Sequence, residues 1–262
     1  MLGCVDFHTH IFPDHVAARA IQALTQAYGA QAEGSATAAG LMAAMEQAGV
    51  DRAVVCPVAT RPDQVASINR WVVNLDRQYF LPFGALHPGS DDLAQELAFL
   101  RDHDVRGVKL QPHFQGYQLD DPAALRMIEQ LADLVILIHG GQEIREIPKV
   151  LATPELLRAL HDRFPSHRLV VAHLGGYRMW ESVREHLLGQ DVYLDLAYTF
   201  NRMPDQEIAE IISAHGPEHI LFASDYPWQL PEEARVGLGR LGLPEEQQHK
   251  IMGGNASALL RL

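Results

Sequence analysis

Two histidines near the start of the chain, His8 and His10, have the spacing of a metal-binding pair. They stand at the end of a short apolar run that predicts a β-strand, and residues i and i+2 of a strand point to the same face. Their imidazoles therefore project side by side, with Asp6 on the same face further down the strand. Adjacent imidazoles on one rigid element can begin a metal site, which other stretches of the chain must complete.

Further polar side chains stand where later apolar runs end, and they include His87, Lys109, Gln111, His113, His139, His173, Asp195 and Asp225. Imidazole and carboxylate ligands suit Zn²⁺, and also Mn²⁺, Fe²⁺ or Co²⁺. Because no cysteine cluster lies nearby, a structural zinc site is excluded. Three histidines and one carboxylate leave a position for a water molecule, whose pKa a divalent metal can lower to about 7.

Eight short apolar runs carry these residues at or near their ends, namely residues 3–8, 52–57, 81–86, 105–110, 134–139, 169–173, 192–196 and 220–224. Most are continuous in Val, Ile, Leu, Phe and Ala, which is typical of parallel strands covered on both faces. Between and after them lie helical patterns, at residues 41–48, 64–77, 91–103, 123–132, 154–164, 180–188, 205–215, 232–241, 245–252 and 256–260.

This alternation predicts an α/β fold, a (β/α)8 TIM barrel formed by one domain over residues 1–262. A doubly wound open sheet, the competing fold, usually has a Gly-rich phosphate loop after its first strand, and no such glycines occur here. Reactive groups of a barrel gather at the carboxyl ends of its strands, so we expect the residues above to meet there. The small-residue stretch 31–40 reads as a mobile loop of the first repeat.

The charge balance bears on the partners of the protein. Lys and Arg number 21 against 33 Asp and Glu, a formal net charge of −12. This balance argues against nucleic acid or an anionic membrane as the main partner, and leaves a small-molecule substrate. No apolar run approaches the ~18 residues of a membrane span, and the N-terminus has no secretory pattern. Cys4 and Cys56 lie in apolar runs, which fits free thiols in a reducing compartment, so we expect a cytoplasmic protein.

Seven stretches, taken in order, resemble the amidohydrolase superfamily over essentially the whole chain. They are Asp-Phe-His-Thr-His at 6–10, Gly-Val-Lys-Leu-Gln-Pro at 107–112, Ile-His-Gly at 138–140, Val-Ala-His-Leu-Gly-Gly at 171–176, Tyr-Leu-Asp at 193–195, Phe-Ala-Ser-Asp-Tyr-Pro-Trp at 222–228 and Gly-Gly-Asn-Ala at 253–256. The chain is most similar to the amidohydrolase 2 branch, which includes metal-dependent hydrolases and decarboxylases similar to aminocarboxymuconate semialdehyde decarboxylase.

The resemblance implies a role for each matching residue. His8, His10, His139 and Asp225 would bind one divalent metal, with Zn²⁺ expected and Mn²⁺ as the alternative. Asp225 would also take a proton from the metal-bound water. His173 would polarise the substrate carbonyl or shuttle a proton.

Lys109 and His113 are implied as substrate-binding residues. In some relatives a lysine at the position of Lys109 is carbamylated and bridges two metals, whereas the run around it here favours one metal and an unmodified ammonium. That ammonium would pair with Asp225 or Asp6, or meet an anionic substrate. His113 lies in the following loop and would face the substrate.

The implied function is hydrolysis, in which metal-bound hydroxide attacks an ester, lactone or amide carbonyl of a small molecule. The compact chain favours this reading, because the decarboxylases of the branch are usually longer. Two alternatives stay open: non-oxidative decarboxylation of an aromatic or muconate-type carboxylic acid, and a metal-binding barrel without turnover. A homodimer is common among relatives and is a further expectation.

Overall fold

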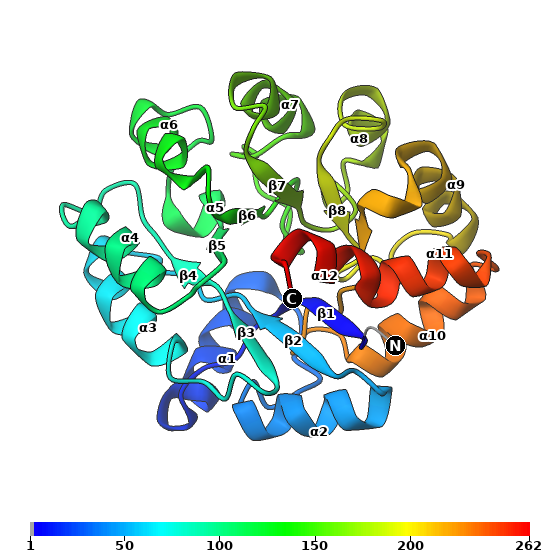
Figure 1. Cartoon of the computed structure of the whole chain (residues 1–262), viewed down its shortest axis with the longest axis horizontal. Helices are drawn as coiled ribbons and strands as arrows, with labels where there is room; N and C mark the ends of the chain where they lie inside the picture. The colour runs from blue at the N-terminus through cyan, green and yellow to red at the C-terminus, as the bar shows by residue number, and fades with distance from the viewer. Residues whose placement is uncertain (1–2) are drawn as a thin grey trace.

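The chain closes into a barrel of parallel strands surrounded by helices (Figure 1). The structure, a computed structural model, describes residues 3–262 apart from the side chain of Tyr28. Within that range nine strands follow one another in sequence order: β1 (Val5–Thr9), β2 (Arg52–Val55), β3 (Phe80–Pro82), β4 (Gly84–Ala85), β5 (Gly107–Leu110), β6 (Val135–Ile138), β7 (Arg168–Val171), β8 (Tyr193–Asp195) and β9 (Ile220–Leu221). The predicted (β/α)8 TIM barrel is confirmed.

The ninth strand arises because one predicted strand, residues 81–86, is divided into β3 and β4. β3 ends at Pro82, which has no N–H to donate to the ladder. Phe83 then donates its N–H to the carbonyl of Val55 at 3.0 Å, and its ring packs edge-on against Phe7 with 5.7 Å between centroids. Hydrogen bonding therefore links β1–β3 as one sheet and β4–β9 as another. Each of the other seven predicted strands coincides with one observed strand.

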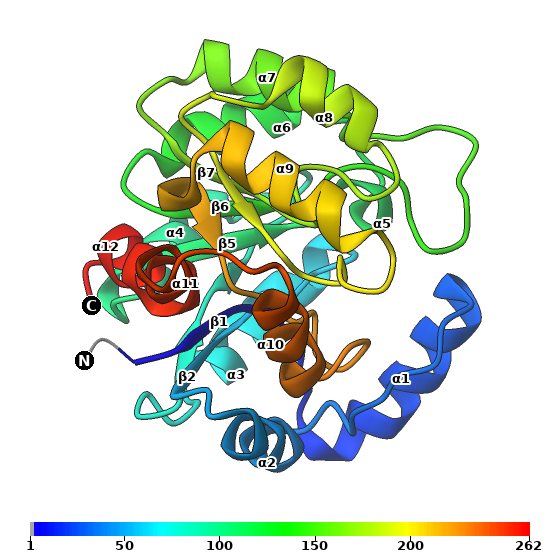
Figure 2. The ribbon, with the colours of Figure 1, turned by 90° about the vertical axis from the view of Figure 1, so that its right-hand side faces the viewer.

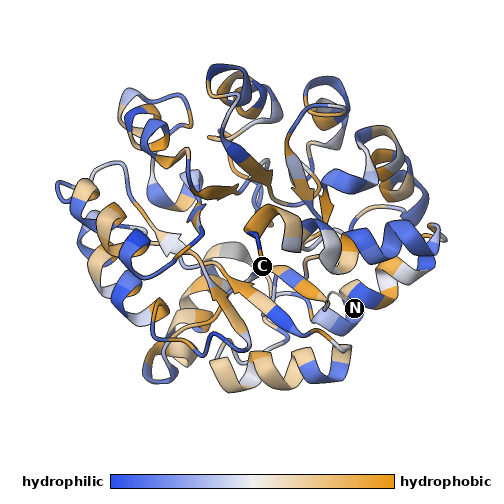
Figure 3. Ribbon diagram, in the orientation of Figure 1, coloured by the Kyte–Doolittle hydropathy of each residue, from blue (hydrophilic) through white to orange (hydrophobic). Residues whose placement is uncertain are grey.

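Side chains of the strands alternate between the barrel interior and the surrounding helices. In β6, Val135 and Leu137 join the interior cluster, whereas Ile136 and Ile138 pack in the larger cluster beneath the helices. This alternation is the period of two expected of a strand, and it explains why both faces are apolar. Figure 3 shows mostly hydrophobic strands inside, surrounded by helices that carry both hydrophobic and hydrophilic residues.

The helices agree closely with the helical patterns, and they are α2 (Ala38–Ala48), α3 (Val65–Val72), α4 (Leu93–Asp102), α6 (Pro122–Ile128), α7 (Pro154–Arg163), α8 (Trp180–His186), α9 (Asp205–His215), α10 (Pro231–Arg240), α11 (Glu245–His249) and α12 (Asn255–Leu260). α12 crosses the end of the barrel where the strands begin, and its residues Ala256, Leu259 and Leu260 belong to the interior cluster (Figure 1). None of the helices in the described range is long and apolar enough to cross a membrane.

Two helices were not predicted, α1 (Asp14–Tyr28) and the short α5 (Pro112–Gln115). Figure 2 shows α1 on the side of the molecule toward which the strands run. The stretch 31–40, expected to be a mobile loop, includes the start of α2 and is held by the barrel. Ala36 is buried and accepts a hydrogen bond from Phe12 at 2.8 Å, and Gly34 donates to Pro227 at 3.1 Å.

The barrel is closed by contacts between β1 and the segment around β9. Phe7 donates its backbone N–H to Phe222 at 2.8 Å, and the N–H of Asp225 donates to the carbonyl of His8 at 2.9 Å. Asp6 is buried between the two segments, and its carboxylate accepts hydrogen bonds from the N–H of Ser224 at 2.9 Å and its hydroxyl at 2.5 Å. Burial raises the pKa of Asp6 to about 7. This closure joins the two ends of the chain directly below the predicted metal ligands.

Candidate metal centre

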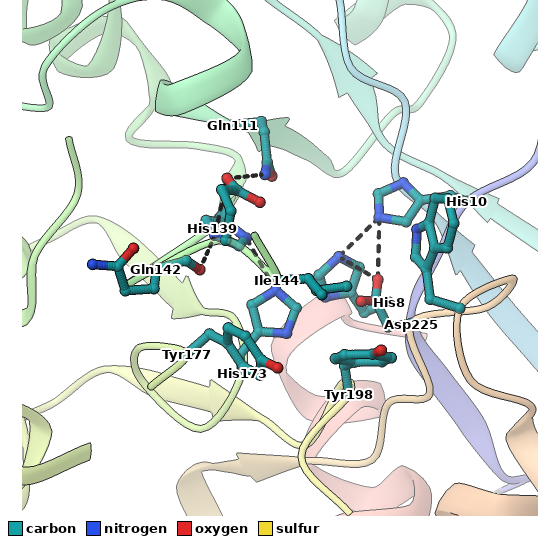
Figure 4. Close-up of a pocket in the computed structure, with 12 residues that line it drawn as sticks. His8, His10, Gln111, His139, Gln142, Ile144, His173, Tyr177, Tyr198 and Asp225 are labelled. Atoms are coloured by element: carbon teal, nitrogen blue, oxygen red, sulfur yellow. Dashed lines mark hydrogen bonds and ion pairs between the residues drawn. The ribbon is translucent and has the colours of Figure 1, made fainter. Parts of the chain in front are cut away.

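Three of the predicted metal ligands, His8, His10 and Asp225, converge where β1 ends and the segment after β9 begins (Figure 4). Nε2 of His8 lies 3.2 Å from Nε2 of His10. Oδ1 of Asp225 lies 3.6 Å from the first nitrogen and 3.4 Å from the second. We call these three residues the metal triad. Asp225 has a φ of +72°, a strained backbone angle that turns its carboxylate toward the imidazoles.

The other ring nitrogens of the triad show that its donors fit a cation. Nδ1 of His8 lies 2.9 Å from a carboxylate oxygen of Asp195, and Nδ1 of His10 lies 2.8 Å from the carbonyl of Cys56. Both partners are acceptors, so each Nδ1 carries the proton and each Nε2 presents a lone pair. Two lone pairs and a carboxylate oxygen facing one point repel one another, and only the ammonium of Lys109, 2.9 Å from Nε2 of His8, offsets this among the described residues. The residues therefore fit a divalent metal, with the tautomers already set for binding.

The pKa shifts agree with this arrangement. Burial lowers the pKa of His8 well below its usual value, and the positive charge of Lys109 lowers it further. His8 therefore stays neutral and able to bind a metal in mildly acidic solution. Burial alone would raise the pKa of Asp225, but the positive charge that His8 and its neighbouring imidazoles carry when protonated outweighs burial and holds its pKa below the usual range. Asp225 is a carboxylate at neutral pH.

Lys109 lies buried on β5, with Nζ 2.9 Å from Nε2 of His8. Burial lowers the pKa of its ammonium. It is not among the residues that line the pocket described below, so it contacts the triad rather than the space open to a substrate. The expected substrate contact of Lys109 therefore has no support in its position.

His139 and His173 form a second pair of facing imidazoles. Nδ1 of His139 lies 3.0 Å from Nε2 of His173. The outer nitrogens contact backbone carbonyls, that of Gln142 at 3.2 Å from His139 and that of Ala197 at 2.9 Å from His173. Two lone pairs 3.0 Å apart would repel each other, so one of the inner nitrogens carries a proton that the other accepts. The structure places His139 in this pair, beside the metal triad and in the wall of the same pocket, so its role as the fourth ligand stays a prediction.

A cavity of about 30 Å³ lies over the triad, and its wall is formed by His8, His10, Gln111, His139, Gln142, Glu143, Ile144, His173, Tyr177, Tyr198, Asp225 and Trp228. Tyr177, Tyr198 and Trp228 form one cluster, against which Ile21 and Leu24 of α1 pack. The cavity is narrow, and α1 lies behind the aromatic part of its wall.

Sequence reasoning missed Glu143 as a site residue. It is buried four positions after His139, and its Oε1 lies 3.4 Å from Nε2 of His139 and accepts from Nε2 of Gln111 at 3.2 Å. Burial raises the pKa of Glu143 to about 8. The sequence signal that could have indicated Glu143 is an acidic residue shortly after Gly140 and Gly141. His113, by contrast, lies half-buried on α5 and outside the pocket wall, so the structure does not place it as a substrate ligand.

Comparisons with known proteins place this site in a family. The family model described as amidohydrolase matches residues 5–262. A search of curated protein sequences finds no significant match. Among solved structures, an uncharacterised TIM-barrel protein from Bordetella bronchiseptica is 18% identical, with 98% of each chain covered and a TM-score of 0.76.

Two further solved structures are decarboxylases. A 2,6-dihydroxybenzoate decarboxylase complexed with 2,6-dihydroxybenzoate is 14% identical, with 100% of each chain covered and a TM-score of 0.73. A dihydroxybenzoic acid decarboxylase from Polaromonas sp. JS666, with bound manganese and the inhibitor 2-nitroresorcinol, is 13% identical, with coverage of 100% and 98% and a TM-score of 0.72. These likenesses show the fold, and the family model shows more: this chain belongs to the amidohydrolase family, in its amidohydrolase 2 branch.

Proposed function

We propose that the protein is a metal-dependent, non-oxidative decarboxylase of a small hydroxylated aromatic carboxylate. The observation that carries the proposal is the pocket in which His173 and three aromatic side chains face the metal triad. Decarboxylases among the similar structures, one of them holding manganese, support this reaction over the hydrolysis that the compact sequence favoured.

A divalent metal at the triad would hold and polarise the carboxylate and a neighbouring hydroxyl of the substrate. The aromatic side chains would enclose the ring and exclude water. His173, which lines the pocket, would deliver a proton to the ring carbon that bears the carboxylate. The C–C bond to the carboxylate then breaks, its electron pair returns to the ring, and CO₂ leaves. One proton is consumed for each CO₂ released, and no oxidant is needed.

Hydrolysis of an ester, lactone or amide is the second candidate, and the position of Asp225 favours it. Its Oδ1 lies within 3.6 Å of Nε2 of both His8 and His10, beside any water that the metal would activate. Asp225 could take the proton of that water as the carbonyl is attacked. A metal-binding barrel without turnover is the outcome if neither reaction occurs.

A substrate panel separates these functions. The Mn²⁺- and Zn²⁺-loaded proteins are incubated with 2,6-dihydroxybenzoate, other hydroxybenzoates, and small esters and lactones, and CO₂ and acid release are measured. We expect CO₂ from a hydroxybenzoate, and a loss of at least about 100-fold in kcat for His173→Asn, the size of a general acid contribution. His113→Asn is the matched control, because that imidazole lies outside the pocket wall. Acid release from esters without CO₂ would refute decarboxylation.

We also propose one divalent ion per chain, Zn²⁺ or Mn²⁺, bound by the triad. Elemental analysis should find about one ion in the wild type and a loss of it in His8→Ala/His10→Ala. A cytoplasmic location is proposed because Cys4 and Cys56 are buried free thiols.

A further inference from the structure

Six arginines gather at the end of the barrel where the strands begin, opposite the metal triad. They stand at or before the starts of β2, β3, β5 and β7, at the end of α4 and just after α12, and we call them the basal arginine cluster: Arg52, Arg77, Arg101, Arg106, Arg168 and Arg261. Figure 1 looks onto this end, where α12 crosses the barrel. The concentration is unexpected in a chain that carries a net charge of −12.

The cluster lines two neighbouring clefts of about 480 and 200 Å³. Both clefts include Asp104, Arg106 and Leu260 in their walls, so one guanidinium and the carboxylate that it contacts lie between them. Against the six arginines, the side chains of these walls offer two carboxylates, Asp104 and Asp133. The larger cleft has the volume of a small-molecule site.

Three of the guanidiniums are fixed by the fold and use both carboxylates. Arg101 makes two hydrogen bonds to Asp133, at 2.8 and 2.7 Å. Arg106 donates to the carbonyls of Leu260 and Arg261 at 2.7 and 2.6 Å, and to Asp104 at 3.2 Å.

Arg168 donates to the carbonyl of Leu259 at 3.0 Å and also contacts that of Asp133. The carbonyls near the end of α12 therefore hold Arg106 and Arg168 in place. Guanidiniums held in this way are preorganised, so an anion would lose little affinity in ordering them.

Positive charge is left over in the cluster. Within residues 3–262, Arg52 and Arg261 form no ion pair, and Arg77 donates to the carbonyl of His103 at 3.0 Å rather than to a carboxylate. Burial lowers the pKa of Arg77 and Arg168; the carboxylate of Asp104 offsets part of this at Arg77, whereas the charge of Arg261 lowers the pKa of Arg168 further. Two side-chain carboxylates thus face six guanidiniums, which leaves net positive charge in the walls of the clefts.

We propose that the basal arginine cluster binds a small anion with two phosphate groups, one in each cleft beside Arg106. Guanidinium forks match the oxygens of phosphate two at a time, and adjoining clefts suit two linked anionic groups better than one. The anion would bridge β2, β5, β7 and the end of α12. It would therefore stabilise the closed base of the barrel, remote from the reaction.

The probe is inorganic pyrophosphate, titrated into the purified protein by calorimetry at low ionic strength, with orthophosphate and citrate in parallel. The wild type should bind one pyrophosphate per chain, at least tenfold more tightly than orthophosphate, and its Tm should rise with pyrophosphate concentration. Arg52→Gln/Arg261→Gln removes two guanidiniums that form no ion pair, and we expect it to fold normally and bind pyrophosphate at least tenfold more weakly.

Arg158→Gln is the matched control, because it removes an exposed arginine of α7 that pairs with Asp162, away from the clefts. It should bind pyrophosphate like the wild type. Three results would overturn the proposal: no binding at millimolar pyrophosphate, tighter binding of citrate, or equal binding by the double variant. Equal binding would place the anion elsewhere, for example on a metal at the triad.

Discussion

Replacing Asp195 by asparagine tests the metal centre most sharply. Oδ2 of the buried carboxylate accepts from Nδ1 of His8 at 2.9 Å, and Oδ1 accepts the backbone N–H groups of His173 at 2.8 Å and Ala197 at 3.1 Å. An asparagine must keep its carbonyl oxygen toward the two backbone donors, which leaves its NH₂ facing His8. The proton of His8 then moves to Nε2, the nitrogen that faces the metal.

The expected loss follows from the buried hydrogen bond. A hydrogen bond to a charged group contributes about 1.5–3 kcal/mol, which corresponds to a roughly 10- to 100-fold change in an equilibrium constant. Replacing the partner behind a metal-bound histidine has an effect of the same size. We therefore expect Asp195→Asn to bind Mn²⁺ about 10- to 100-fold more weakly than the wild type.

Free Mn²⁺ can be followed by electron paramagnetic resonance during titration of the metal-free proteins, and circular dichroism checks that each variant is folded. Asp191→Asn is the matched control, because Asp191 is exposed just before β8 and pairs with His219 at 3.3 Å. It should leave Mn²⁺ affinity unchanged. A folded Asp195→Asn protein that binds Mn²⁺ within twofold of the wild type would refute the reasoning.

Three further predictions concern the scaffold. Burial lowers the pKa of His215 below its usual 6.5, so the unfolded chain takes up the proton first as the pH falls. The free energy of unfolding should therefore decrease below about pH 6.5, by roughly 1 kcal/mol per pH unit. Urea unfolding at pH 7.5 and 5.5 should show a smaller decrease for His215→Gln than for the wild type. Gly141 and Gly189 both have a positive φ, so alanine at either position should lower the free energy of unfolding by a strain of about 1–3 kcal/mol. Gly141→Ala should lower it further, because a Cβ there meets the backbone of Tyr177 at 2.4 Å. Equal losses in Tm for the two variants would contradict this. Thr153→Ala removes the cap of α7 and should lower the unfolding free energy by about 1 kcal/mol, and an unchanged value would count against the cap.

Much of the fold could be predicted because both faces of each strand are buried. The runs are therefore continuous and apolar, and Thr153 and Pro154 mark a helix start by their chemistry alone. The division at Phe83 could not be seen, because the run stays apolar through the break. Helix α1 was missed although Ile21 and Leu24 have helical spacing, since its partly buried face meets the aromatic cluster of the site rather than the sheet.

The site was predicted in part: residues at strand ends could be placed from the sequence, whereas contacts set by loops could not. His8, His10 and Asp225 follow from strand ends that a closed barrel must bring together. Loop conformation, in contrast, decides where Glu143 points, and no pattern in the sequence sets it. The contact of His139 with His173 depends on the carbonyls of two loops, which sequence alone does not locate.

The closure of the barrel by β1 and the segment after β9 has a consequence for biosynthesis. His8 and Asp225 are more than 200 residues apart, so the triad cannot form until synthesis has passed Asp225. A shorter nascent chain offers the His8–His10 pair without the carboxylate of Asp225. Metal acquisition is therefore a late event, and once bound the ion ties the first strand to the last and closes a loop of more than 200 residues.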